Sequence, residues 1–170
     1  REWQSFNHVY FFLFPPENEE TYRNLLGEDW DRDANRQRAL DELAEQTAAE
    51  PDNAYAWFNM GTNLTYFSRY GEAVQAYDTA RNLGLPQRMY RYQFGPFMAY
   101  FNTGRIEELL ALANYALEIT PNSEEALLWR GWAYFRQGLN DKALTDWRKA
   151  MEARPGYTDA QYAINFIGGN

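Results

Sequence analysis

The chain has 170 residues, of which 45% are apolar and 24% charged, so it is long enough to bury a core and is neither disordered nor collagen-like. A net charge of −8 argues against a general binder of nucleic acid, which needs a positive surface. Cysteine is absent, which excludes disulfides, thiolate zinc sites and a cysteine nucleophile within these residues. Aromatic residues make up 18%, more than a fold of this size requires.

Residues 1–16 differ from the rest of the chain. The run Val9–Phe14 is β-branched and aromatic and ends at Pro15-Pro16, a pattern that predicts a strand covered on both faces. It is too short to cross a membrane, and the start is not a signal peptide. Because the first residue is Arg1 rather than Met, we expect a piece of a longer protein, with 1–16 as the end of an upstream domain. Packing as an arm against the rest, or pairing with a second copy, are the alternatives.

Apolar residues three and four positions apart predict helices over the remainder, and therefore an all-α fold. In chain order the predicted helices are 18–27, 32–49, 54–68, 70–83, 88–103, 105–119, 123–137, 140–153 and 158–167. Gly104 and Gly138 are expected to take a left-handed conformation between paired helices. Ser123 and Asn140 are predicted N-caps.

A repeat of 34 residues runs through these helices. It is visible in four positions of the last unit, Ala143, Trp147, Ala150 and Pro155, and their counterparts Leu109, Ala113, Ala116 and Pro121. The preceding unit lies 36 residues earlier, because two extra residues fall in the turn 84–89. Gly61 and Gly131 are expected where two helices approach closely, with the rings of Tyr77 and Trp147 in the adjacent space.

Two motifs resemble the tetratricopeptide repeat (TPR). They are Trp57-x-x-Met60-Gly61-x-x-Leu64 with Ala73-x-x-x-Tyr77, and Arg130-Gly131-x-x-Tyr134 with Ala143-x-x-x-Trp147. The middle unit departs from the family, since Phe97 replaces the glycine and Ala113 the ring. The resemblance covers about 32–167 and implies a right-handed α-solenoid. We place a TPR domain over 17–170, with units 54–87, 90–123 and 124–157, a half-repeat 32–53 and a capping helix 158–167.

A second, shorter resemblance lies at the N-terminus. Trp3-x-x-Phe6-Asn7-x-x-Tyr10, leading to Phe14-Pro15-Pro16-Glu17, is similar to the junction in bacterial papain-like cysteine peptidases of the double-glycine type. In that family the last strand of the peptidase runs into TPR units. The resemblance implies that the catalytic Cys and His lie upstream, and no catalytic residue of the family can be placed on this chain. It also implies an exported or membrane-anchored parent protein, with the cytoplasm as the alternative.

Catalytic chemistry finds little support in these residues. His8 is the only histidine and has no identifiable catalytic partner. The acidic pairs Glu19-Glu20, Glu107-Glu108 and Glu124-Glu125 are expected to stabilise helix starts rather than to bind metal. No glycine-rich phosphate loop is present. We therefore predict no catalytic residues, no metal site and no cofactor, and an undetected hydrolase is the minor alternative.

TPR proteins bind partners in a concave groove formed mainly by the first helix of each pair. The predicted groove residues are Tyr55, Phe58, Asn59, Thr62 and Tyr66 in the first unit, Arg91, Phe94, Met98, Phe101 and Asn102 in the second, and Glu125, Leu128, Trp129, Trp132, Phe135 and Arg136 in the third. The set is rich in rings and lacks the Lys, Arg and Asn clamp of chaperone-binding members. We expect about half of its rings to be partly exposed, because a register error of one residue exchanges groove for core.

The sequence thus predicts a non-catalytic module for protein–protein interaction, forming the C-terminal region of a double-glycine-type peptidase homologue. The expected partner is an apolar or aromatic peptide, the protein's own upstream domain or a second copy. A free-standing TPR adaptor or a self-association scaffold is the alternative. Neither nucleic acid nor direct membrane insertion is expected.

Overall fold

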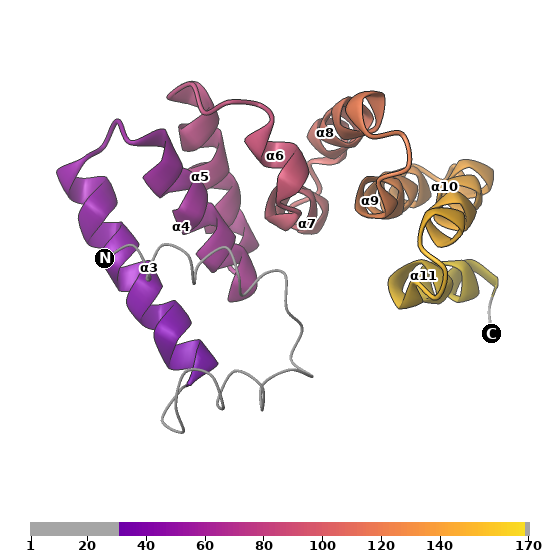
Figure 1. The fold of residues 1–170 in the computed structure, drawn as a ribbon, viewed down its shortest axis with the longest axis horizontal. Coiled ribbons are helices and arrows are strands. Elements are labelled where there is room, and N and C mark those ends of the chain that lie inside the picture. Colours follow the sequence, from indigo (N-terminus) through magenta and orange to yellow (C-terminus); the bar gives the residue numbers. More distant parts are fainter. Residues whose placement is uncertain (1–30, 169–170) are drawn as a thin grey trace.

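The computed structural model describes residues 31–168, except the side chains of Arg32 and Tyr92. These residues form helices and no strand (Figure 1). The helices are α3 (Arg32–Ala49), α4 (Ala54–Tyr66), α5 (Tyr70–Asn82), α6 (Met89–Tyr92), α7 (Gly95–Asn102), α8 (Ile106–Ile119), α9 (Glu124–Arg136), α10 (Asn140–Ala153) and α11 (Thr158–Gly168). The predicted strand at Val9–Phe14, the predicted helix 18–27 and His8 lie outside the described residues.

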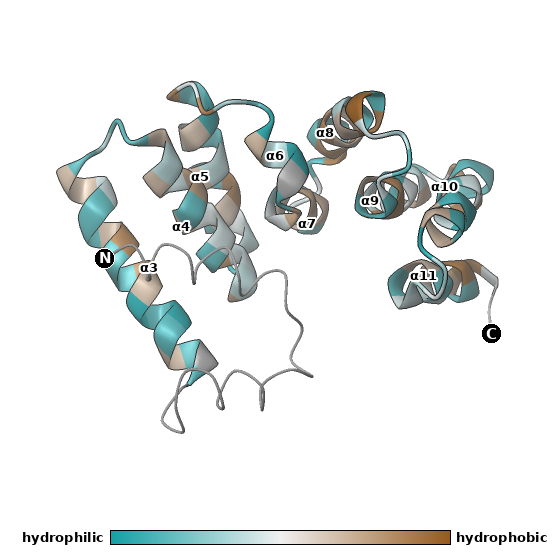
Figure 2. Ribbon diagram, viewed as in Figure 1, coloured by the Kyte–Doolittle hydropathy of each residue, from teal (hydrophilic) through white to brown (hydrophobic). Residues whose placement is uncertain are grey.

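The helices form an α-solenoid of antiparallel pairs. The pairs are α4 with α5, α7 with α8, and α9 with α10, and each pair packs on the next. α3 packs on α4 as the second half of a further unit, and α11 packs on α9 and α10. The hydropathy of the residues differs along the array, since α3 is largely hydrophilic while α8 carries hydrophobic residues along much of its length (Figure 2).

The predicted helix 88–103 is wrong in one respect, because the structure breaks it into α6 and α7. The break lies at Gln93, which is extended with φ −124° and ψ 122°. Pro96 accounts for it, since its ring has no N–H to donate to the carbonyl of Tyr92 and would collide with that carbonyl in a continuous helix. Pro96 instead occupies the first turn of α7, where a backbone N–H would have no acceptor within the helix.

The turns within the pairs follow the predicted glycines. Gly104 and Gly138 have φ of 74° and 77°, so both close a first helix in the left-handed conformation. In the first pair the equivalent residue is Ser68, which has φ 58° despite its side chain. The Ser123 hydroxyl caps α9 by accepting from the Ala126 N–H, as predicted. The prediction for Asn140 is wrong: it is the first residue of α10, and Leu139 precedes it without a side-chain cap.

The two motif glycines lie directly against buried rings, as expected. A Cβ on Gly61 would lie 2.7 Å from the Tyr77 ring, and a Cβ on Gly131 would lie 2.2 Å from Trp147 Nε1. Both rings are fully buried. Trp147 Nε1 also donates to the Leu128 carbonyl at 3.0 Å, which fixes the indole between α9 and α10.

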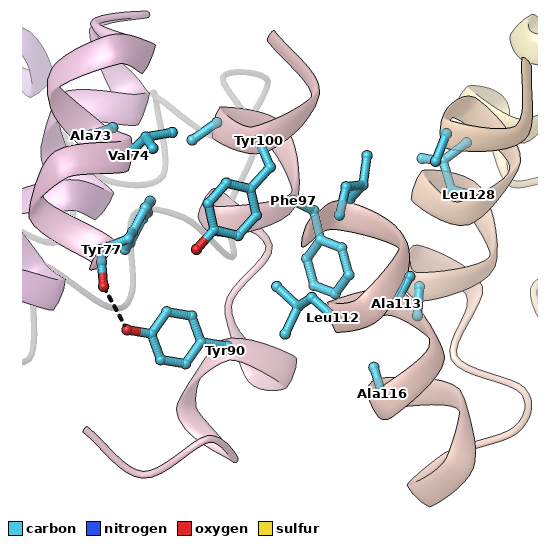
Figure 3. Packing of buried hydrophobic residues seen from close by; sticks show 14 of the residues in the cluster. Ala73, Val74, Tyr77, Tyr90, Phe97, Tyr100, Leu112, Ala113, Ala116 and Leu128 are labelled. Atoms are coloured by element: carbon cyan, nitrogen blue, oxygen red, sulfur yellow. Dashed lines mark hydrogen bonds between the residues drawn. The ribbon is translucent and has the colours of Figure 1, made fainter. Parts of the chain in front are cut away.

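The middle pair inverts this arrangement. Phe97 stands at the position of Gly61 and Gly131, while Ala113 stands at the position of the ring. Both are fully buried, and Figure 3 shows the Phe97 ring directed toward α8 near Leu112 and Ala113. The ring therefore comes from the first helix instead of the second. This exchange keeps the space between the helices filled, which close packing requires.

Candidate binding faces

The residues predicted to line a groove lie on α4, α6, α7 and α9. Figure 1 places α7, α9 and α11 along one side of the array and α8 and α10 along the other. α7 contacts α9, and α9 contacts α11, so side chains of these three helices can form one continuous surface. We call this the first-helix side.

Three of the predicted groove residues are buried and belong to the core: Phe58, Thr62 and Leu128. Phe58 packs against Tyr77 and Tyr90, with ring centroids 5.3 and 5.2 Å away. The reason is α6, whose Tyr90 packs over Phe58 and donates its hydroxyl to the Tyr77 carbonyl at 2.8 Å. The Leu128 carbonyl accepts a hydrogen bond from the indole N–H of Trp147.

Four predicted rings meet on the first-helix side and remain partly exposed: Phe101, Trp129, Trp132 and Phe135. Phe101 lies 5.8 Å from Trp129 and 6.0 Å from Trp132 between ring centroids, and Trp132 lies 5.8 Å from Phe135. These distances are typical of aromatic pairs in contact. With Phe166 of α11, described next, we call these residues the aromatic face.

The sequence predicts residues 158–167 only as a capping helix, whereas α11 also adds a ring to this face. Phe166 is 53% exposed, and its ring lies 5.8 Å from Trp132 and 5.6 Å from Phe135. Tyr162, also exposed, lies beside it at 6.2 Å. A signal was present, because Phe166 follows Trp132 by the repeat length of 34 residues. The register therefore places Phe166 at the same position of the next first helix.

The first unit presents a different surface, with polar groups beside its rings. Tyr55 is 49% exposed and Asn59 is partly buried. The Tyr66 hydroxyl donates to Asp33, and the Arg36 guanidinium lies 4.9 Å from the centre of the Tyr66 ring. This surface of α4 can offer hydrogen bonds as well as apolar contact.

The remaining predicted residues lie between these regions or at the edge of the aromatic face. Arg91, Phe94 and Met98 are half-buried on α6 and α7. Asn102 is exposed, and its side-chain amide donates to the Met98 carbonyl at 2.8 Å. The exposed Arg136 places its guanidinium 5.4 Å from the centre of the Phe101 ring, a cation–π contact. The aromatic face thus has a positive charge at its rim.

Glu125 is the one carboxylate of the predicted groove, and its surroundings disfavour its charge. Burial raises the pKa of Glu125, and the neighbouring charges of Asp159 and Glu124 add to the rise. The Tyr157 hydroxyl and Arg154 oppose it. The carboxyl therefore protonates more readily in the folded chain than in water.

A separate cleft of about 490 Å³ lies between α3, α4 and α5. Its apolar floor includes Trp57, Met60 and Leu64, and its polar rim includes Asp41 and Arg69. Trp57 is the first position of the TPR motif in this unit. It is only partly buried, and its indole N–H donates to the Pro51 carbonyl at 2.9 Å. No signal in the repeat motif marked these residues as accessible.

Two kinds of site are absent from residues 31–168. No group of three or more His, Cys, Asp or Glu side chains is arranged to hold a metal ion there. None of the helices in the same range has the length and apolarity needed to cross a membrane.

Comparison with known proteins identifies the repeat. The family model of the tetratricopeptide repeat matches residues 124–157, the α9–α10 unit. Solved structures share the whole arrangement: MamA from Desulfovibrio magneticus RS-1 superposes with a TM-score of 0.69 at 20% identity, covering 88% of this chain and 83% of that one. The fold is a TPR solenoid. YrrB, a TPR protein with an unusual peptide-binding site, superposes with a TM-score of 0.64 at 21% identity, covering 88% of this chain and 74% of that one.

Two human proteins show distant sequence similarity to this TPR chain. Protein O-mannosyl-transferase TMTC3 from Homo sapiens is 25% identical over 85% of the chain, and Tetratricopeptide repeat protein 13 from Homo sapiens is 28% identical over 76%. The chain matches only 17% and 15% of the length of these proteins.

Proposed function

We propose that this chain is a non-catalytic TPR module for protein–protein interaction, which binds an apolar or aromatic segment of a partner on its aromatic face. The observation that carries the proposal is the continuous set of partly exposed rings shared by α7, α9 and α11. Covering such rings with a partner lowers the free energy of the complex, because apolar surface is removed from water.

The size of the face is sufficient for a firm contact. Full burial of an aromatic side chain removes about 150–250 Å² from water, which corresponds to roughly 4–6 kcal/mol at about 25 cal/mol per Å² before ordering costs. The rings of the aromatic face are already partly buried, so each contributes only a fraction of this. Two or three such anchors nevertheless dominate a typical interface.

The face is also preorganised. Trp132 packs against both Phe101 and Phe166, and it rests on the buried Trp147 with ring centroids 4.9 Å apart. Rings held in this way lose little side-chain freedom when a partner binds, which lowers the entropic cost of association. The peptide-binding site of YrrB, on the same fold, supports a peptide as the partner.

The experiment uses two rings at the edge of the face and a random twelve-residue peptide library displayed on phage. Trp129→Ala combined with Phe166→Ala is expected to remove most of the capture of peptides selected on the wild type, while the far-UV circular dichroism stays unchanged. Ile119→Ala, which truncates an apolar side chain 48% exposed on α8, is the matched control and should bind like the wild type. Equal capture by all three proteins would refute the aromatic face as the binding surface.

We further infer from the resemblance of residues 1–16 that the parent protein carries a double-glycine-type cysteine peptidase domain upstream and is exported or membrane-anchored. The similarity to the peptidase junction is the support for this part of the proposal. In that arrangement the partner of the aromatic face would be the peptidase domain or a peptide presented to it. The coding sequence upstream of Arg1 tests it: a Cys and a His–Asp pair within about 150 residues, one domain length, supports the inference. An unrelated domain there would refute it.

A further inference from the structure

The solenoid contains three equivalent notches, each formed by two consecutive second helices and the first helix between them. The first notch is formed by α3, α4 and α5, the second by α5, α7 and α8, and the third by α8, α9 and α10. On α4 and α5, residues of the first notch correspond to the second at a spacing of 36, and the second corresponds to the third at 34. On the preceding second helix these spacings are 34 and 36, so equivalent residues of the first and third notches are 70 apart throughout. The notches can therefore be compared position by position.

An arginine closes the third notch. Arg130 of α9 donates from Nε and Nη2 to both carboxylate oxygens of Asp146 on α10, at 2.6 and 2.8 Å, and from Nη1 to Asn114 on α8 at 3.0 Å. Its guanidinium lies 5.8 Å from the centre of the Tyr134 ring. The planar fork of arginine suits this bidentate contact, and Asp146 is buried beneath it.

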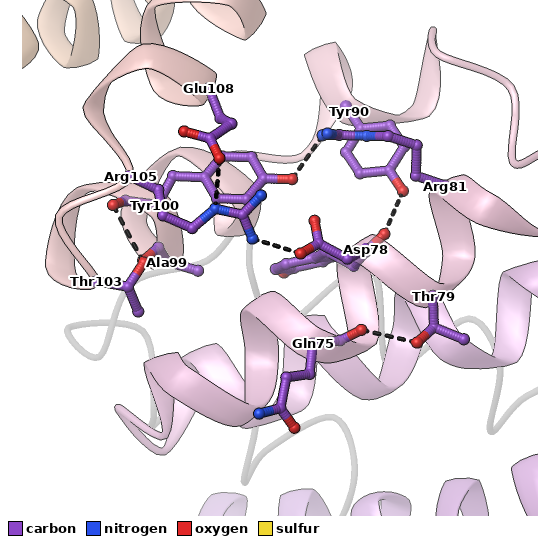
Figure 4. A network of polar contacts seen from close by, with 11 residues as sticks. Gln75, Asp78, Thr79, Arg81, Tyr90, Ala99, Tyr100, Thr103, Arg105 and Glu108 are labelled. Carbon is purple, nitrogen blue, oxygen red and sulfur yellow. Dashed lines mark hydrogen bonds and ion pairs between the residues drawn. The ribbon is translucent and has the colours of Figure 1, made fainter.

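An arginine also bridges the second notch (Figure 4). Arg105, just before α8, pairs with Asp78 on α5 and donates to Glu108 at 2.8 Å. Its guanidinium lies 5.0 Å from the centre of the Tyr100 ring, and Tyr100 corresponds to Tyr134 of the third notch. Both closed notches thus hold a guanidinium beside a carboxylate and a tyrosine.

The first notch lacks the residues that close the third. Met60 stands at the position of Arg130, Ala76 at that of Asp146 and Ala44 at that of Asn114. All three line the cleft of about 490 Å³, and Leu64 lies there in place of the tyrosine. The cleft is therefore the space that Arg130 and its partners fill in the third notch. Arg69, at the position of Arg105 of the second notch, stays on the rim of the cleft and is paired with Glu72.

The charges of this cleft favour a cation. Arg69 is already paired with Glu72, because its Nε and Nη2 donate to the two carboxylate oxygens of Glu72 at 2.7 and 2.6 Å. Asp41, on the opposite wall, accepts a hydrogen bond from Gln37 at 2.9 Å. None of the ion pairs among the described side chains involves it. One negative charge is thus left on the rim above an apolar floor.

We propose that this cleft binds an arginine side chain of a partner protein. The guanidinium lies at Asp41, and the aliphatic stem lies over Met60 and Leu64. Trp57, Met60 and Leu64 lie on the side of α4 opposite Tyr55, Asn59 and Tyr66, because successive helical residues turn by about 100°. The aromatic face lies on α7, α9 and α11, whereas the cleft lies on α3, α4 and α5, so the two sites are separate and a partner can occupy either one alone.

The test compares two acetylated peptide amides, Ser-Ala-Arg-Ala-Ser and the same peptide with citrulline, the neutral isostere of arginine. Binding is followed by ¹H–¹⁵N NMR at the Trp57 indole and at the amides of Ala44 and Ala76. We expect the arginine peptide to bind with a dissociation constant on the order of 1 mM, and at least fivefold more tightly than the citrulline peptide. Asp41→Asn should remove that preference. Equal binding of the two peptides, or shifts confined to the aromatic face, would overturn the proposal.

A second pair of variants tests the location without altering charge. Ala44→Leu fills the cleft from an exposed helical position and should weaken the arginine peptide at least fivefold. Ala111→Leu makes the same change at an exposed position of α8 and should bind like the wild type. Because both changes add a good helix former at an exposed site, both proteins are expected to fold. Wild-type affinity in Ala44→Leu would show that the cleft is not the site.

Discussion

Replacing Gly131 by alanine places a methyl group in a space that Trp147 already fills. The new Cβ would lie 2.2 Å from Trp147 Nε1 and 2.5 Å from Cδ1, well inside the contact distance of about 3.5–4.0 Å. The indole cannot retreat easily, because it is fully buried and its Nε1 donates to the Leu128 carbonyl at 3.0 Å. The collision must therefore separate α9 from α10 or break this hydrogen bond.

The magnitude follows from three contributions. Overpacking a filled core costs about 1–3 kcal/mol. Leaving the buried indole N–H without its acceptor costs about 1–3 kcal/mol more. Alanine returns about 1 kcal/mol through its helix propensity. We expect a net loss of about 3 kcal/mol, which lowers the melting temperature by roughly 6–12 °C at about 2–4 °C per kcal/mol for a domain of this size.

Thermal and urea unfolding followed by far-UV circular dichroism measures this loss. Gly71→Ala is the matched control, since Gly71 is exposed on α5 and an added Cβ meets nothing within 4 Å. It should gain up to about 1 kcal/mol of stability. Gly131→Phe with Trp147→Ala copies the Phe97 and Ala113 pair and should be more stable than Gly131→Phe alone. A Gly131→Ala protein as stable as the wild type would refute the packing argument.

Two further predictions concern backbone strain and pH. Ser68→Gly should stabilise the fold by up to about 1 kcal/mol in urea unfolding, because a left-handed φ of 58° strains serine and not glycine; a less stable variant would show that the serine side chain outweighs the strain. Glu125→Gln should raise the melting temperature at pH 7. The folded pKa of Glu125 is raised, so its stabilising effect is complete below its unfolded pKa of about 4.3 and is lost as the pH rises through the folded pKa. The difference between variant and wild type should therefore disappear at acid pH, and a constant difference at all pH values would contradict the assignment.

Most of the fold could be predicted because the repeated spacing of residues along the chain also determines which residues pack together. Gly131 and Trp147 are sixteen residues apart, yet the repeated spacing alone predicts their contact, which the structure contains. Helices 32–49 and 140–153 begin and end where the periodicity places them. The broken helix at Pro96 could have been predicted too, since proline forbids a continuous helix on local grounds.

The binding faces were less predictable, since exposure depends on neighbours distant in sequence. Phe58 and Trp132 both lie on first helices, but Tyr90 of α6 packs over Phe58, whereas Trp132 stays partly exposed beside Phe166 of α11. The repeat spacing places Phe166 at the position of Trp132 in the next first helix, but the contact between the two rings depends on how α11 packs beside α9.

The sequence by itself determined the helical pairs, the packing of glycine against ring and the aromatic richness of the first helices, because each depends on spacing along the chain. Only the tertiary structure decided which rings stay accessible and where a notch stays open, because both depend on how neighbouring units fill space. Arg130 closes one notch with Asp146, whereas Met60, at the same position of another unit, leaves a cleft. The openness of that cleft is a property of three helices together.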